Sequence, residues 1–223
     1  LGPQDGRTDG NLQKLLAAGA GAGVQATVTV ETDKPTFGNA ENIVAGVRYL
    51  KDRYTGAGNW LRYNGRPVVM FWRPDALPTD GGSLVDAWRA VRDAADPNGE
   101  MAWVMEGLSW DLLDVFDGQF GYSLAWSPNP ANTTASWASR VRAKGKLFIA
   151  TVMPGYDDTR VRPAPEGFSR DRGDGAFLAS TWQAAIRAGA EWVNVTSFNE
   201  WIEGSQIEPS AAYGDLYLRL NRE

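Results

Sequence analysis

Apolar and polar positions along this chain follow two periods, one typical of buried strands and one typical of amphipathic helices. The runs at 67–73 and 147–153 are almost unbroken in apolar residues, and the run at 24–31 is rich in β-branched residues. Runs of this kind suit parallel strands that are buried on both faces. We predict strands at 24–31, 67–73, 101–106, 118–124, 147–153 and 192–198.

Between these strands, apolar residues recur three and four positions apart, as on the buried face of a helix. The first helix is expected to follow Asp9 and Asn11 and to bury Leu12, Leu15 and Leu16. Other helices are predicted at about 40–54, from the N-cap Ser83, at about 131–143, from Leu178 to Ile186 and from about Ala212, with a short helical stretch around Leu112. Strands that alternate with helices in this way predict parallel βαβ units.

The number of βα units decides between two α/β architectures. A closed (β/α)8 barrel needs eight units and typically ~250 residues, and about six units are predicted in these 223 residues. We expect a (β/α)8 TIM barrel that forms one domain over residues 1–223, with its first two units outside this chain. The alternative is a doubly wound open sheet. No Gly-x-Gly-x-x-Gly turn follows any predicted strand, which argues against a dinucleotide site.

Composition restricts the chemistry that this fold can carry. The chain has neither histidine nor cysteine, which excludes a Ser-His-Asp triad, a histidine-ligated zinc site and disulfides. Acid–base chemistry near neutral pH must then come from carboxylates, lysine or tyrosine. The net charge of −5 argues against a nucleic-acid partner. No apolar run approaches the ~20 residues of a membrane span.

Polar and aromatic side chains follow the predicted strands where a barrel gathers its functional residues, at the carboxyl ends. In chain order these are Glu31, Trp72, Arg73, Glu106, Trp126, Tyr156, Asp157, Asp158, Asn199, Glu200, Trp201 and Glu203. Carboxylates and flat aromatic rings are what a sugar-binding cleft needs. The ten tryptophans of the chain therefore have two candidate uses, core packing and sugar platforms.

The segment after the last predicted strand holds the strongest candidate for catalysis. Glu200 and Glu203 are three residues apart, so a helical turn would present both carboxylates on one side. Cleavage of a glycosidic bond uses such a pair, with one group protonated and the other ionised. On spacing alone, the simpler interpretation is a helix-starting loop with solvated glutamates.

Three segments of the chain resemble glycoside hydrolase family 99, the endo-α-mannosidase family. The run from Thr196 to Pro209 is similar to the family's Asn-Glu-Trp-His-Glu-Gly-Thr-Gln-Ile-Glu sequence, and 154–163 is similar to its Pro-Gly-Tyr-x-Asp-Thr-x-x-Arg-Pro loop. The strand that ends in Glu31 resembles a family strand ending in Ile-Glu-Pro-Tyr. The resemblance implies a (β/α)8 barrel and a retaining glycosidase that acts on α-linked mannose or a related polysaccharide.

The resemblance also implies roles for individual residues. Glu200 would take the proton of the sugar 2-hydroxyl, and Glu203 would protonate the leaving oxygen and later activate water, by way of a 1,2-anhydro sugar. Tyr156 and Glu31 would line the subsite of the reacting sugar. The other expected substrate contacts are Trp72, Arg73, Glu106, Trp126, Asn199 and Trp201. The implied partner is a carbohydrate, and neither a metal nor another cofactor is implied.

Three positions depart from the family pattern. Ile202 and Met105 stand where the mannosidases have histidines, and Thr32 stands where a proline follows the strand-end glutamate. The loss of both histidines favours an alternative, a carbohydrate-binding barrel of the same family without turnover. An aldolase-like barrel is a third interpretation, but the nearest candidate for a Schiff-base lysine, Lys34, is poorly placed.

Overall fold

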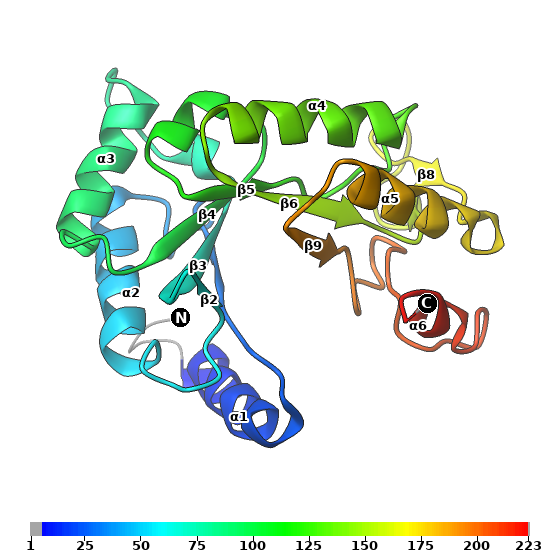
Figure 1. The fold of residues 1–223 in the computed structure, drawn as a ribbon, viewed down its shortest axis with the longest axis horizontal. Helices are drawn as coiled ribbons and strands as arrows, with labels where there is room; N and C mark the ends of the chain where they lie inside the picture. The colour runs from blue at the N-terminus through cyan, green and yellow to red at the C-terminus, as the bar shows by residue number, and fades with distance from the viewer. Residues whose placement is uncertain (1–5, 223) are drawn as a thin grey trace. The chain divides into compact units, whose positions relative to one another are not determined.

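The computed structural model describes residues 6–222, and the chain divides into two compact units on either side of the Gln119–Phe120 bond. The ribbon in Figure 1 shows strands and helices alternating along the chain. Strand β5 (Gly118–Phe120) contains the boundary between the units. Among the described residues, no helix combines the length and the apolar character that a membrane crossing requires.

The first unit is built around three parallel strands. Its elements are α1 (Gly6–Ala22), β1 (Thr29–Glu31), α2 (Ala40–Arg53), β2 (Arg62–Tyr63), β3 (Arg66–Trp72), η1 (Pro74–Ala76), α3 (Leu84–Ala95), β4 (Ala102–Glu106) and η2 (Trp110–Asp114). Strand β3 pairs in parallel with β1 and with β4, and β2 returns antiparallel onto β3. Asn64 and Gly65 make that return with φ angles of 50° and 77°, as a tight hairpin turn requires.

The core of the first unit holds the strands in place. Helices α2 and α3 lie side by side next to the sheet (Figure 1). Between helix α3 and strands β3 and β4, Phe71 stacks on Trp103 with ring centroids 4.7 Å apart, and Trp88 meets Phe116 edge-on at 5.0 Å. Such aromatic pairs contribute about 0.5–1.5 kcal/mol each beyond the burial of their surface. The cluster therefore fixes β3 and β4, whose carboxyl ends carry candidate site residues.

The second unit contains a parallel strand pair and a short hairpin. Its elements are α4 (Pro130–Ala143), β6 (Leu147–Val152), β7 (Tyr156–Asp157), β8 (Ser169–Arg170), η3 (Gly173–Gly175), α5 (Ala176–Arg187), β9 (Trp192–Val195) and α6 (Leu216–Leu220). Strands β6 and β9 pair in parallel, and β7 and β8 pair antiparallel. Every residue of β6 is buried, because α4 and α5 pack against it (Figure 1).

All six predicted strands have a counterpart, in β1, β3, β4, β5, β6 and β9. Three of them are shorter than predicted: β1 covers 29–31 of the predicted 24–31, β5 covers 118–120 of 118–124, and β9 covers 192–195 of 192–198. Strands β2, β7 and β8 were not predicted. They are two residues long each, which is too short for a period of two to show in the sequence.

Four details of the predicted helices are wrong. Helix α1 begins by Gly6, before Asp9, and helix α6 begins at Leu216 instead of about Ala212. Leu15 and Ile186 were assigned to buried faces but are 50% and 72% exposed. Each directly precedes or follows a residue on the true buried face, and one step along a helix rotates the side chain by about 100°.

Candidate active site

The loop after β9 carries the candidate glutamates and folds back onto its own first residues. Ser197 donates its N–H to the Ser205 carbonyl at 3.0 Å, and Ile207 donates to the Ser197 carbonyl at 2.9 Å. The Ser197 hydroxyl oxygen also accepts the N–H of Glu200 at 2.8 Å. Serine is suited to this position because its side chain satisfies an otherwise open backbone donor. The backbone that carries Glu200 and Glu203 is therefore fixed at both ends.

The carboxylate of Glu203 is held from two sides. Tyr122 donates its hydroxyl to Oε2 at 2.9 Å, and Arg162 donates Nη2 to Oε1 at 3.1 Å. The Glu203 carbonyl accepts the N–H of Asp157 at 2.8 Å. Its side chain is only 16% exposed. Hydrogen bonds to an ionised partner are stronger than neutral ones, so both the backbone and the carboxyl group of Glu203 are well positioned.

A second buried carboxylate supports the arginine that binds Glu203. Asp158, with a side chain 2% exposed, accepts hydrogen bonds from Tyr156 at 3.0 Å, from Arg162 at 2.5 Å and from the Phe168 N–H at 2.9 Å. Burial raises the pKa of Asp158, but these donors, with the Arg162 guanidinium first among them, outweigh burial and hold that pKa below its ordinary value. Arg162 therefore links two carboxylates with its two Nη atoms.

The charges of both glutamates affect the pKa of Tyr122. Burial raises the pKa of its hydroxyl well above the ordinary value, and the carboxylates of Glu203 and then Glu200 raise that pKa further. The hydroxyl therefore keeps its proton and remains a donor to Glu203. Glu200 is half-buried, and its Oε1 accepts the N–H of Ile202 at 3.3 Å. Each carboxyl group thus has a fixed partner: Tyr122 and Arg162 bind Glu203, and the Ile202 N–H binds Glu200.

Aromatic side chains of the second unit are held in defined positions. Trp126 and Trp201 are 52% and 49% exposed; their Nε1 atoms donate to the Ser123 carbonyl at 2.9 Å and to the Glu208 carboxylate at 2.8 Å. Tyr156 is buried and stacks on Phe168 with ring centroids 4.7 Å apart. Asn199 is exposed, and its carbonyl accepts the Trp201 N–H at 3.0 Å. Trp126 and Trp201 thus offer indole faces to a ligand.

The remaining expected site residues lie together at one edge of the first unit. Glu31 is opposite Trp72 at the carboxyl ends of β1 and β3, and Glu106 ends β4. Arg73 follows Trp72 and binds Asp75 with Nε and Nη2 at 3.0 and 3.1 Å. The Asp75 carboxylate raises the pKa of Arg73 most, and Glu106 adds to the effect. The pairing of Met105 with Phe71 places Glu106 at the same edge of the sheet as Trp72.

The three positions that depart from the family pattern have different surroundings. Thr32 is buried; its N–H and its hydroxyl donate to the Trp72 carbonyl at 3.1 and 2.8 Å, and the hydroxyl also contacts the Arg73 carbonyl. A proline has neither donor, so this link between the ends of β1 and β3 depends on the threonine. Met105 is fully buried, whereas Ile202 is 62% exposed.

Four residues that contact the candidate site residues or their loops were not predicted as site residues from the sequence: Tyr122, Arg162, Arg170 and Arg172. Tyr122 comes two residues after β5, so its position near a strand end was a usable signal. Arg162 lies inside the loop that resembles the family motif. Arg170 ends the unpredicted strand β8 and Arg172 follows it. Both bind backbone carbonyls, and a sequence does not reveal such contacts.

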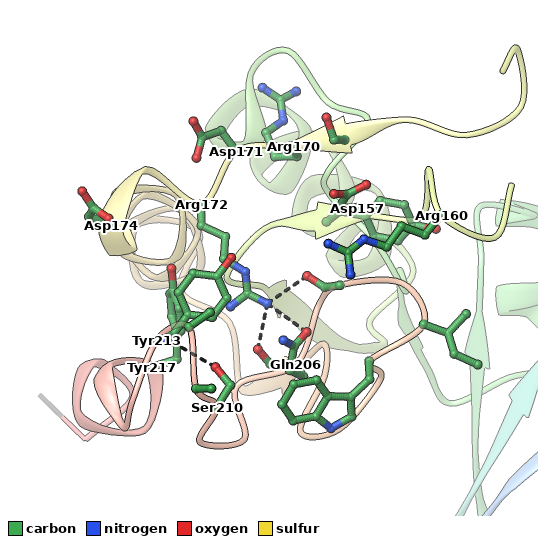
Figure 2. Close-up of a pocket in the computed structure, with 17 residues that line it drawn as sticks. Asp157, Arg160, Arg170, Asp171, Arg172, Asp174, Gln206, Ser210, Tyr213 and Tyr217 are labelled. Carbon is green, nitrogen blue, oxygen red and sulfur yellow. Dashed lines mark hydrogen bonds between the residues drawn. The ribbon is translucent and has the colours of Figure 1, made fainter. Parts of the chain in front are cut away.

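A pocket of about 680 Å³ adjoins the turn at Gly204 (Figure 2). The buried guanidinium of Arg172 lies 4.4 and 4.6 Å from the ring centroids of Tyr213 and Tyr217. Its Nη2 donates to the carbonyls of Gly204 and Gln206, at 2.8 and 3.0 Å. Arg172 therefore connects the pocket with the loop that carries the glutamates.

Comparisons with known proteins show the family of the chain. Residues 3–214 match the family model of glycosyl hydrolase family 99. A human glycoprotein endo-alpha-1,2-mannosidase-like protein is 30% identical over 210 residues, which are 79% of this chain and 44% of that protein. The Xenopus laevis glycoprotein endo-alpha-1,2-mannosidase is 27% identical over 216 residues, which are 90% of this chain and 47% of that protein. The chain thus spans less than half the length of these curated relatives.

Solved structures show the same fold. A GH99 endo-alpha-mannosidase from Bacteroides thetaiotaomicron, in complex with BIS-TRIS-Propane, has a TM-score of 0.83 and 26% sequence identity. The likeness covers 100% of this chain and 76% of that one. It confirms the predicted (β/α)8-barrel class.

Proposed function

This chain belongs to glycosyl hydrolase family 99, and from that premise we propose that it acts as a glycoside hydrolase on glycans with α-linked mannose. The names of its relatives support the substrate class. One observation carries the catalytic assignment: the carboxylate of Glu203 is held by the Tyr122 hydroxyl and the Arg162 guanidinium, on the same loop as the half-buried Glu200. Glycosidic cleavage requires two carboxyl groups, one that donates a proton and one that accepts a proton.

The first step of the proposed reaction breaks the glycosidic bond. Glu200 takes the proton of the sugar 2-hydroxyl, and the freed oxygen attacks C1. As the bond from C1 to the leaving oxygen breaks, Glu203 gives its proton to that oxygen. The products of this step are the released sugar and a 1,2-anhydro sugar, with Glu200 protonated and Glu203 ionised.

The second step restores both carboxyl groups and retains the configuration at C1. Glu203 takes a proton from water, and the resulting hydroxide attacks C1 of the anhydro sugar. The C1–O2 bond opens, and O2 takes back the proton held by Glu200. Glu203 acts on both sides of the cycle, first as acid and then as base. Its bonds to Tyr122 and Arg162 hold the carboxyl group in one place for both transfers.

Replacement of each glutamate by glutamine tests the assignment. With α-1,2-linked mannose oligosaccharides as substrate, we expect Glu203→Gln and Glu200→Gln to lower kcat by a factor of about 10²–10⁴, the usual contribution of a general acid or base. Glu191→Gln is the matched control, because Glu191 is an exposed glutamate directly before the opposite end of β9. Release of sugar at the wild-type rate by Glu203→Gln would remove it from the acid role.

A second candidate function is carbohydrate binding without turnover. It is favoured by Ile202 and Met105, which put apolar side chains where the resemblance expects histidines. The same experiment separates the two functions. Wild-type protein that binds the oligosaccharide in calorimetry, yet releases no more sugar than Glu203→Gln, supports the binding protein and overturns the hydrolase.

A further inference from the structure

Two arginines at the end of the β7–β8 hairpin each bind the backbone of a different loop. Arg170 donates Nε to the Ala125 carbonyl at 2.8 Å and Nη2 to the Ser127 carbonyl at 2.9 Å. These two carbonyls flank Trp126, one of the exposed indoles. The guanidinium also lies over the Phe177 ring, 5.5 Å from its centroid. Arg170 therefore fixes the backbone on both sides of a predicted sugar platform.

Arg172 does the same for the loop of the glutamates. Its Nη2 donates to the carbonyls of Gly204 and Gln206 and, at 3.0 Å, to the Gln206 side chain. Gly204 directly follows Glu203. Arg172 is 7% exposed, and Figure 2 shows its guanidinium beside the rings of Tyr213 and Tyr217. Its buried Nη1 makes no hydrogen bond among the described residues, so Nη2 and the cation–π contacts with the rings hold the group.

Close packing around Gly204 couples the position of Glu203 to the position of Arg172. A Cβ on Gly204 would lie 2.9 Å from the Asp157 carbonyl oxygen, and a Cβ on Gly155 would lie 2.5 Å from Cγ of Arg172. The Asp157 N–H already donates to the Glu203 carbonyl. The turn at Glu203 and Gly204 is thus confined between β7 on one side and Arg172 on the other.

We propose that Arg170 and Arg172 are positioning residues with separate targets: Arg170 positions Trp126 for sugar binding, and Arg172 positions Glu203 for proton transfer. The proposal rests on the proposed function, because it assigns each arginine to one stage of that reaction. Each acts through the backbone of the loop that it binds.

Replacement of each arginine by lysine separates the two targets, because lysine keeps the charge but loses the planar, multiple donors. For Arg170→Lys we expect KM to rise about fivefold or more with kcat within about twofold, the pattern of lost substrate binding. For Arg172→Lys we expect kcat to fall about 10- to 100-fold with KM within about twofold, since a small misplacement of a catalytic group is that costly. Arg187→Lys, at an exposed arginine of α5, is the matched control.

A second readout does not depend on activity. Hydrogen exchange of the Asp157 amide, which donates to Glu203, should accelerate in Arg172→Lys and not in Arg170→Lys. Exchange of the Ser127 amide, which donates to the Leu124 carbonyl at 3.0 Å, should show the reverse.

The outcomes distinguish this proposal from the proposed function. If the wild type is active and each of the two lysine variants changes kcat and KM to the same extent, or changes neither, the proposal of separate targets is overturned. Wild-type protein without activity on any α-mannoside overturns the proposed function. In that case the exchange rates decide the positioning alone, and acceleration at both amides in both variants overturns it.

Discussion

The hydroxyl of Tyr122 is affected by both candidate glutamates. It donates to Glu203, and the charges of Glu203 and Glu200, after burial, raise its pKa. A hydroxyl that stays protonated can act only as a donor to these carboxylates in the working pH range. Removal of this one oxygen should therefore affect Glu203 without disturbing the packing of the ring.

We expect Tyr122→Phe to lower kcat about tenfold and to leave KM within about twofold, as the loss of one hydrogen bond to a catalytic group does. Tyr49→Phe is the matched control. Tyr49 also donates its hydroxyl to a carboxylate, that of Asp9, but in the first unit and on helix α2. It should lower the melting temperature and leave kcat unchanged. Steady-state kinetics and thermal unfolding of both variants give the answer, and a drop in kcat for Tyr49→Phe alone would contradict the assignment.

Single residues also show how far the sequence predicts a site. Glu200, Glu203 and Trp126 could be predicted as candidates, because a strand end is recognisable and carboxylates and tryptophans that gather there suit a sugar-binding cleft. The ten tryptophans could not be sorted in advance. Trp60, Trp88, Trp103 and Trp137 turn out to be buried, and Trp126 and Trp201 are exposed. Burial of a side chain depends on which face of its helix or strand packs against a neighbouring element. The local sequence pattern predicts that face only in part.

At the scale of an element, the loop from β9 to Ile207 depends on the conformation of Gly204. Its φ is 58°, and an added Cβ would meet the Asp157 backbone at 2.9–3.0 Å. A side chain here would thus face both an unfavourable backbone conformation and a close contact. The contact pushes against β7, the strand whose N–H binds the Glu203 carbonyl.

We expect Gly204→Ala to lower kcat about tenfold or more through displacement of Glu203. Gly214→Ala is a closely matched control, since Gly214 has a φ of 54° and a Cβ there would have no neighbour within 4 Å. It should carry only the backbone strain, about 1 kcal/mol, which thermal unfolding measures. Equal kcat for the two variants would show that the contact with Asp157 does not displace the Glu203 carboxylate.

The elements themselves were predictable to different degrees. Strand β6 follows from a long apolar run, because burial on both faces leaves a strong signal. The hairpin of β7 and β8 has four residues, of which Asp157 and Ser169 are exposed, and it is defined by pairing between distant residues. No local pattern carries that pairing. Arg170, which ends β8, and Arg172, which follows it, were missed for the same reason.

At the scale of the whole molecule, hydrogen-bonded aspartates make stability depend on pH. Asp9 accepts bonds from Tyr54 at 2.5 Å, Tyr49 at 2.9 Å and Gln13 at 3.0 Å. The Tyr54 bond contributes most to holding the pKa of Asp9 below its ordinary value, against the opposing effect of burial. A carboxyl whose pKa is depressed by folding stabilises the fold above its unfolded pKa, about 3.9. That contribution is lost as the pH falls through the folded pKa.

Tyr49, in the same cluster, limits the stability of the fold at alkaline pH. Burial, followed by the bond to Asp9, raises its pKa to about 12. A tyrosine whose pKa is raised by folding stabilises the fold below its unfolded pKa, about 10, and this contribution disappears as the pH rises toward 12. The cluster that joins α1 and α2 should therefore contribute a plateau of stability with an acid limb from Asp9 and an alkaline limb from Tyr49.

Thermal unfolding across pH tests this plateau with two variants. Asp9→Asn should melt below the wild type at pH 7, and the difference should shrink below about pH 4, where the wild-type carboxyl also becomes protonated. Tyr49→Phe should retain the acid limb and flatten the alkaline one. Asp93→Asn, at an exposed position of α3, controls for the loss of one charge. A constant gap between Asp9→Asn and the wild type from pH 7 to pH 3 would assign the acid limb to other carboxylates, of which Asp158 is the first to replace because folding also depresses its pKa.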